Sequence, residues 1–181
     1  MREHEHPDQY GFTLVEAVVS VSIVAVISVV LLVGASSARR GAAVRNGAQQ
    51  VAGFLREAAA LTVNGVKEPT CGIDAACSSY RVSYPVVGSS VTYTRVAEGG
   101  GASATRTLPA GTRFTTSGFV IFRLTPPVLS VAIAPVPVNS PPVHLPPGSK
   151  LSIPVEHRSG GSAWNVCVDG SGGVLVTAGA C

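Results

Sequence analysis

The sequence lacks the common catalytic signatures. It contains no Gly-x-Ser-x-Gly nucleophile elbow, no glycine-rich phosphate loop and no His-Glu-x-x-His zinc helix. These absences argue against the hydrolase, nucleotide-binding and metalloprotease classes. We therefore expect a protein that is not an enzyme, with no catalytic residue and no cofactor.

A metal site is also not predicted. Two of the four histidines lie within the first ten residues, and neither His144 nor His157 has cysteines at zinc spacing beside it. Cys71 and Cys77 are separated by five residues, whereas zinc half-sites use about two to four, and no second half follows. We expect surface histidines and no metal ligand.

Charge is missing altogether from a run of 22 residues, Ala17–Ala38. As a helix this run is about 33 Å long, against about 30 Å for the hydrocarbon core of a bilayer, so it predicts one transmembrane span. A cleaved secretory signal is the alternative, because Ser36–Ala38 has a small-x-small pattern. The run is longer than the roughly 7–15 residues of a signal core, however, and no basic segment precedes it.

Gly11–Glu16, which reads Gly-Phe-Thr-Leu-Val-Glu, stands directly before this run. It resembles the processing site of type IV prepilins and type II secretion pseudopilins. Glycine lacks a Cβ, so the backbone at Gly11 can lie flat in a peptidase site. The resemblance implies that prepilin peptidase removes residues 1–11 as a leader and that the new N-terminal residue, Phe12, is methylated.

Glu16 is a carboxylate at the mouth of the apolar run, where a charge is costly and usually functional. The resemblance implies that it meets the N-terminal amine of a neighbouring subunit during assembly. The alternative is an interfacial glutamate that snorkels to water.

The same resemblance implies a single-pass protein of the bacterial inner membrane, with the globular domain outside the cytoplasm. The flanking charges point the other way. Three acidic residues outnumber Arg2 in the leader, residues 1–11, whereas Arg39, Arg40 and Arg45 follow the run. Positive charge alone would favour a cytoplasmic location for the second flank.

After the span the sequence becomes amphipathic. Apolar residues recur at steps of four and three at Val44, Ala48, Val51, Leu55, Ala58 and Thr62, with Phe54 and Leu61 beside them. Arg45, Gln49, Arg56 and Glu57 lie off this stripe. One helix from Phe12 to about Asn64 is predicted, with residues 12–38 in the membrane and 39–64 packed under a sheet. Asn64-Gly65 and Pro69 supply its stop.

Residues 65–181 contain short runs of β-branched and aromatic residues between turn residues, which is typical of a β-rich globular domain. The predicted strands are Tyr80–Tyr84, Val91–Val96, Arg113–Thr115, Phe119–Leu124, Leu129–Ala134, Leu151–Val155, Trp164–Val168 and Val174–Thr177. Between Pro126 and Pro147, rich in proline, we expect an edge strand and an extended connector. The fold class is therefore α+β, and the pilin resemblance implies a lollipop layout.

A second resemblance lies in this domain. Leu108–Gly111, Phe119–Phe122 and Val166–Val174 are similar to the β-rich domain of GspH/FimT-type minor pilins. It implies a minor subunit of a type IV pilus or a type II secretion pseudopilus. Its partners would be other pilin subunits, prepilin peptidase and the assembly platform. A one-span anchored binding domain is a further alternative.

DNA uptake or surface binding is the runner-up function. Removal of the leader would raise the net charge from +3 to +5, because 12 basic and 7 acidic residues remain. Some FimT-type pilins bind DNA through C-terminal arginines, but Gly170–Val176 contains none. Phosphate contacts supply most non-specific DNA affinity, so DNA binding is not favoured. The other basic residues that could gather on one face are Arg81, Arg95, Arg106, Arg113, Arg123 and Arg158.

The four cysteines form two pairs that are close in sequence. In a domain that faces an oxidising compartment, an even number favours disulfides. We expect Cys71–Cys77 and Cys167–Cys181, the second closing over a turn at Asp169–Gly173. Either of the other two connectivities would need the loop after the helix to lie against the C-terminal strands.

Overall fold

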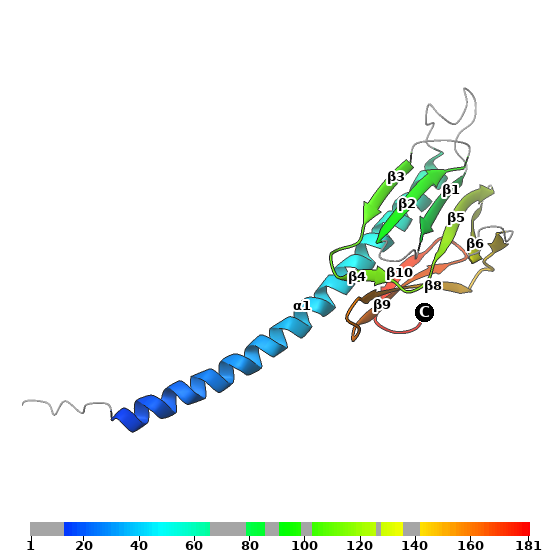
Figure 1. Ribbon diagram of the computed structural model, residues 1–181. Helices are drawn as coiled ribbons and strands as arrows, with labels where there is room; N and C mark the ends of the chain where they lie inside the picture. The colour runs from blue at the N-terminus through cyan, green and yellow to red at the C-terminus, as the bar shows by residue number, and fades with distance from the viewer. Residues whose placement is uncertain (1–12, 66–78, 86–90, 99–102, 126–127, 136–141) are drawn as a thin grey trace, which may run out of the picture. The chain divides into compact units, whose positions relative to one another are not determined.

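The computed structural model describes residues 13–65, 79–85, 91–98, 103–125, 128–135 and 142–181. In this part of the chain, one long helix, α1 (Leu14–Asn64), is followed by ten strands that pair antiparallel (Figure 1). The fold class is α+β, as predicted. The chain forms two compact units, residues 1–39 and residues 40–181, and α1 contributes to both.

Two antiparallel sheets make up the β-structure of the second unit. The six-stranded sheet has the order β3-β2-β1-β5-β6-β7, and the four-stranded sheet has the order β10-β9-β8-β4. The first contains β1 (Ser79–Tyr84), β2 (Thr92–Ala97), β3 (Ser103–Thr107), β5 (Gly118–Thr125), β6 (Val128–Pro135) and β7 (Val143–His144). The second contains β4 (Thr112–Phe114), β8 (Lys150–His157), β9 (Ala163–Asp169) and β10 (Val174–Thr177).

The C-terminal half of α1 belongs to the core of this second unit. The predicted stripe is buried throughout, with each residue at most 2% exposed: Val44, Ala48, Val51, Leu55, Ala58 and Thr62. Beside the stripe, the ring of Phe54 meets Tyr93 of β2 edge to face, with centroids 5.0 Å apart. The hydroxyl of Thr62 donates to the carbonyl of Ala58 at 2.8 Å, so this buried polar group is satisfied within the helix. The stripe prediction is confirmed.

The helix stops at Asn64, where the sequence predicted its end. Gly65 has a φ of 55°, the left-handed conformation that terminates helices and that glycine adopts at low cost. About two turns earlier, Nη2 of Arg56 donates to the carbonyl of Val174 at 2.7 Å. Since β10 is an edge strand, this bond occupies one carbonyl of the sheet edge.

The predicted strands match observed strands to within two residues at either end. Two strands, β3 and β7, were not predicted. β3 is an edge strand of small and polar residues that are mostly exposed, so it shows no apolar alternation. β7 has only two residues.

The expectation of an edge strand after Pro126 was wrong. β6 lies inside the sheet, because β7 pairs with it at Ala132↔His144 and Ile133↔Val143. The prolines flank β6 or stand at its last residue, Pro135, so the amides in its middle remain free to donate to a second neighbour. Residues 136–141 of the expected connector lie outside the described part.

Candidate processing and assembly site

Thr13 and Glu16, at the N-terminus of α1, are the described residues nearest to the candidate processing site. Gly11 and Phe12 lie outside the described residues, and Thr13 precedes the first helical residue. The amide of Glu16 donates to Oγ1 of Thr13 at 3.3 Å, and the amide of Ala17 donates to the Thr13 carbonyl at 3.1 Å. Thr13 is therefore the N-cap, and Glu16 occupies the third helical position, where a glutamate suits both a capping box and the positive end of the helix.

The following turns of α1 present an apolar surface. In the first unit, large side chains such as Leu14, Val19 and Leu32 are 81%, 51% and 71% exposed. The hydroxyls of Ser20, Ser22 and Ser28 donate to the carbonyls four residues earlier, at 2.7–2.8 Å. Their polar hydrogens are thus satisfied inside the helix, as a bilayer interior requires. By length and composition, α1 is able to cross a membrane.

In the second unit, Glu57 of α1 holds two arginines of the six-stranded sheet. Its oxygens lie 2.8 Å from Nη1 of Arg95 on β2 and 3.4 Å from Nη2 of Arg106 on β3. The Arg95 side chain is only 11% exposed. Both guanidinium groups also lie 5.4 Å from the centroid of Phe54. A carboxylate and an aromatic face together offset the burial of the Arg95 charge.

Glu98, just after β2, makes a second such cluster. Its carboxylate lies 2.8 Å from Arg81 of β1 and 3.2 Å from Arg123 of β5. Burial raises the pKa of Glu98, but hydrogen bonds from Arg81, Ser79 and Arg123 outweigh it, so the net pKa lies below its ordinary value. The Arg81 guanidinium also lies 5.0 Å from the ring centroid of Phe119.

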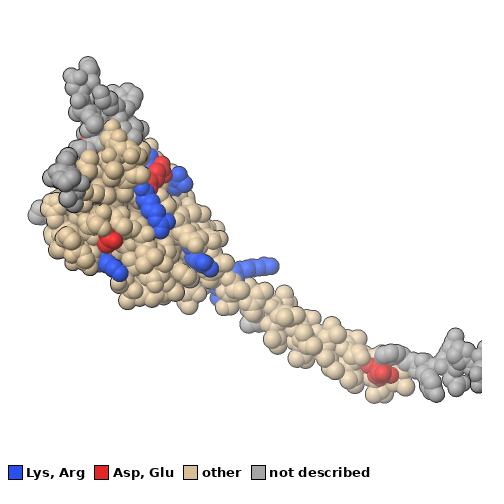
Figure 2. All heavy atoms as spheres, turned by 180° about the vertical axis from the view of Figure 1, so that it is seen from behind, with Lys and Arg blue, Asp and Glu red and all other residues tan. Residues whose placement is uncertain are grey.

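These pairs bear on the DNA hypothesis. Five of the six arginines that the sequence offered are in ion pairs, since Arg113 also lies 2.6 Å from Glu156. The acidic side chains that stand out on the globular unit in Figure 2 lie beside basic ones. A carboxylate that holds an arginine competes with phosphate for it, so these clusters do not favour DNA binding.

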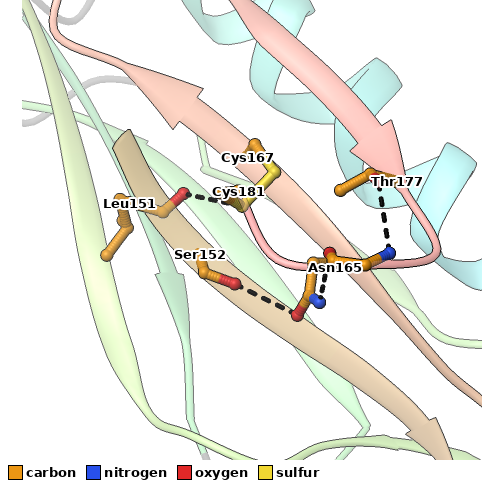
Figure 3. The surroundings of a disulfide bond; sticks show 7 residues. Leu151, Ser152, Asn165, Cys167, Thr177 and Cys181 are labelled. Carbon is orange, nitrogen blue, oxygen red and sulfur yellow. Dashed lines mark hydrogen bonds between the residues drawn. A yellow bond between two sulfur atoms is a disulfide. The ribbon is translucent and has the colours of Figure 1, made fainter. Parts of the chain in front are cut away.

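The C-terminal cysteine pair forms the disulfide Cys167–Cys181, with Cα atoms 5.6 Å apart (Figure 3). Cys167 is buried on β9, and the chain after β10 returns to it along Asn165. Nδ2 of Asn165 donates to the carbonyl of Gly179 at 2.8 Å, and Oδ1 accepts from Ser152 of β8 at 3.0 Å. This is the arrangement expected for that pair. The expected Cys71–Cys77 bond lies outside the described residues.

The turn between β9 and β10 has the sequence Asp-Gly-Ser-Gly-Gly (Asp169–Gly173), and its contacts show why these residue types are needed. Oδ1 of Asp169 accepts from the amide of Ser171 at 2.8 Å, from its hydroxyl at 2.5 Å and from the amide of Gly173 at 2.9 Å. A Cβ at Gly170 would collide with the carbonyl of Pro146. Gly172 has a φ of 88°, and a Cβ there would collide with the side chain of Leu129.

We expect Asp169→Ala to lower the free energy of unfolding by about 1–3 kcal/mol at neutral pH, because several donors lose their acceptor.

The hydrogen bond from the Ser171 side chain is the main reason that the pKa of Asp169 lies below its ordinary 3.8. Burial partly opposes this lowering of the pKa, whereas the amides of Gly173 and Ser171 and the charge of Lys150 add to it. The ionised form therefore adds stability above the ordinary pKa and loses it as the pH falls through the lowered one.

Urea denaturation of wild type and Asp169→Asn at neutral pH and near pH 3 measures this charge effect. The asparagine keeps an acceptor oxygen, so the wild-type advantage should shrink in acid. An advantage that is equal at both pH values would show that the charge of Asp169 does not stabilise the turn.

The histidines lie in different strands, His144 in β7 and His157 at the end of β8. Nδ1 of His157 lies 2.6 Å from Oγ of Ser159. Among the described residues, no three His, Cys, Asp or Glu side chains are placed to share a metal ion. Trp164 of β9 is partly buried and packs against the core.

A comparison with known families connects the start of the chain to a class of proteins. Residues 7–32 match the prokaryotic N-terminal methylation motif. This match supports a type IV pilin-like protein, and the motif together with the apolar helix fits a single-pass membrane-anchored protein. No curated protein and no solved structure matches the chain significantly.

Proposed function

We propose that this chain is a minor pilin or pseudopilin that is assembled into a type II secretion pseudopilus or a type IV pilus. The observation that carries the proposal is the N-terminal methylation motif over residues 7–32, continued by a helix that is apolar enough to cross a membrane. The role is structural: the protein packs with other pilin subunits in a filament. The GspH/FimT-type assignment is supported by the motifs Leu108–Gly111, Phe119–Phe122 and Val166–Val174.

In this proposal prepilin peptidase cuts between Gly11 and Phe12, and Phe12 is methylated. Residues 12–38 then anchor the chain in the inner membrane, while residues 39–64 and the β-rich domain of residues 65–181 lie outside the cytoplasm. Contact with the assembly platform precedes entry into the filament. Glu16 pairs with the N-terminal amine of a neighbouring subunit, so that its charge is neutralised within an apolar helix bundle.

The structural role is favoured over DNA uptake and over an anchored domain that never joins a filament. Ion pairs engage Arg81, Arg95, Arg106, Arg113 and Arg123, so a DNA phosphate would have to displace a carboxylate to reach any of these five side chains. A stand-alone anchor would have no need for a glutamate at the mouth of its span, where the charge costs a few kcal/mol.

Mass spectrometry of membrane fractions from cells that contain prepilin peptidase tests the proposal. We expect a mature chain that starts at N-methylated Phe12. In cells without the peptidase, the chain should retain residues 1–11. A chain that starts at Arg39 would instead indicate signal peptidase cleavage, and an unprocessed terminus in both strains would refute pilin-type maturation.

A further inference from the structure

The second unit begins at Arg40, just after the apolar run. A basic side chain near this start, that of Arg45, lies close to Trp164, the single tryptophan of the chain. Arg40 comes two residues after Ala38 and Arg45 five residues later, and both are exposed on α1. From Ala17 to Arg56 the sequence contains no acidic residue. This stretch therefore carries positive charge directly after the predicted span.

Contacts bring the turn between β8 and β9 to the same turns of the helix. A Cβ at Gly41 would lie 3.9 Å from the hydroxyl of Ser162 in this turn. The guanidinium of Arg45 lies 5.5 Å from the ring centroid of Trp164 at the start of β9. Because helical side chains lean toward the N-terminus, Arg45 reaches back over the turn that contains Gly41. Trp164 thus lies at the end of the unit where α1 enters it.

The turn adds a further exposed cation, Arg158. Arg40 and Arg45 follow the last residue of the apolar run, Ala38, by two and seven residues in sequence. The headgroup layer on one side of a bilayer is roughly 5–8 Å thick, and charge attraction extends over about 8 Å at physiological salt.

We propose that Arg40, Arg45, Arg158 and Trp164 form a surface that binds the anionic phospholipid headgroups of the membrane that α1 crosses. Basic side chains near a membrane attract anionic lipids, and tryptophan prefers the interface because it has an apolar body and a polar N–H. The exposed arginines and the partly buried tryptophan supply both elements. This inference rests on the membrane anchoring in the proposed function, and it adds a lipid-binding surface to the globular unit.

Trp164 is the only tryptophan in the sequence, so its fluorescence reports on this surface alone. The full chain is reconstituted in vesicles of phosphatidylcholine alone or of phosphatidylcholine with phosphatidylglycerol, and quenching by neutral acrylamide is measured. We expect phosphatidylglycerol to lower the quenching constant about twofold, and high salt to reverse this protection.

The double variant Arg40→Gln/Arg158→Gln keeps the contact between Arg45 and Trp164 but removes two charges. It should lose the protection by phosphatidylglycerol. Arg81→Gln/Arg123→Gln is the matched control, because it removes the same charge from the Glu98 cluster, and it should retain the protection.

Co-flotation with the vesicles separates this inference from the proposed function. A wild-type chain that floats with both kinds of vesicle but shows equal quenching in both would overturn the lipid surface and leave membrane anchoring intact. Protection that persists in Arg40→Gln/Arg158→Gln would also overturn the lipid surface. A chain that does not float would overturn both.

Discussion

Glu16→Ala is expected to abolish incorporation into filaments while the chain still inserts into the membrane. Removal of a charge from the mouth of the span makes insertion easier, by up to a few kcal/mol on insertion scales. In the proposed filament, however, Glu16 pairs with the N-terminal amine of the neighbouring subunit, and the same change would leave that amine without a carboxylate, which is strongly destabilising in an apolar environment. Immunoblots of sheared filaments and of membranes, from cells that supply the other subunits, measure the two properties separately.

The helix cap provides the controls for this experiment. The backbone amide of Glu16 donates to Oγ1 of Thr13, and this bond remains in every variant at position 16. The Glu16 side chain stands at the third helical position, where a carboxylate also favours the start of a helix, so its replacement can act through the helix start as well as through subunit pairing. Glu16→Gln keeps a capping side chain of the same size and should fail like Glu16→Ala. Thr13→Ala weakens the cap by about 1 kcal/mol and should assemble normally. Normal incorporation of Glu16→Gln would refute the pairing role.

The second large effect is expected in the core of the globular unit. Phe54→Ala should lower its free energy of unfolding by about 3–5 kcal/mol. The ring of Phe54 is 1% exposed and packs against Tyr93, and it also supports the guanidinium groups of Arg95 and Arg106. Its loss would leave a cavity and take away part of the environment that offsets the buried charge of Arg95.

Chemical denaturation of the full chain in detergent, followed by the fluorescence of Trp164, gives this value. Gln49→Ala, on the exposed side of the same helix, is the matched control and should change stability by less than about 0.5 kcal/mol. Similar values for the two variants would mean that the ring of Phe54 does not anchor the core.

Much of the fold could be predicted because its elements have a strong period. Val44, Val51 and Leu55 repeat at helical spacing and are all buried, and Gly65 ends the helix as its backbone freedom suggests. β3 could not be found, because Ser103–Thr107 is an exposed edge without apolar alternation. The position of β6 depends on a two-residue partner, β7, which has no sequence signal of its own.

The ion-pair clusters could not be predicted from the sequence for a different reason. Arg81 and Arg123 meet at Glu98 because β1 pairs with β5 and the chain after β2 returns beside Ser79. These relations depend on sheet order and register, which a single sequence does not encode locally. Similarly, the contact between Trp164 and Arg45 joins β9 to α1, and nothing in the local sequence of either residue indicates it.

The bond between Arg56 and the carbonyl of Val174 has a consequence for aggregation. An edge strand offers unpaired backbone groups to which a foreign strand can add, and proteins often protect such edges with charged side chains. A strand that added to β10 would first have to displace the guanidinium group from this carbonyl. This edge of the four-stranded sheet is thereby protected by α1, the same helix whose first half is apolar enough to cross a membrane.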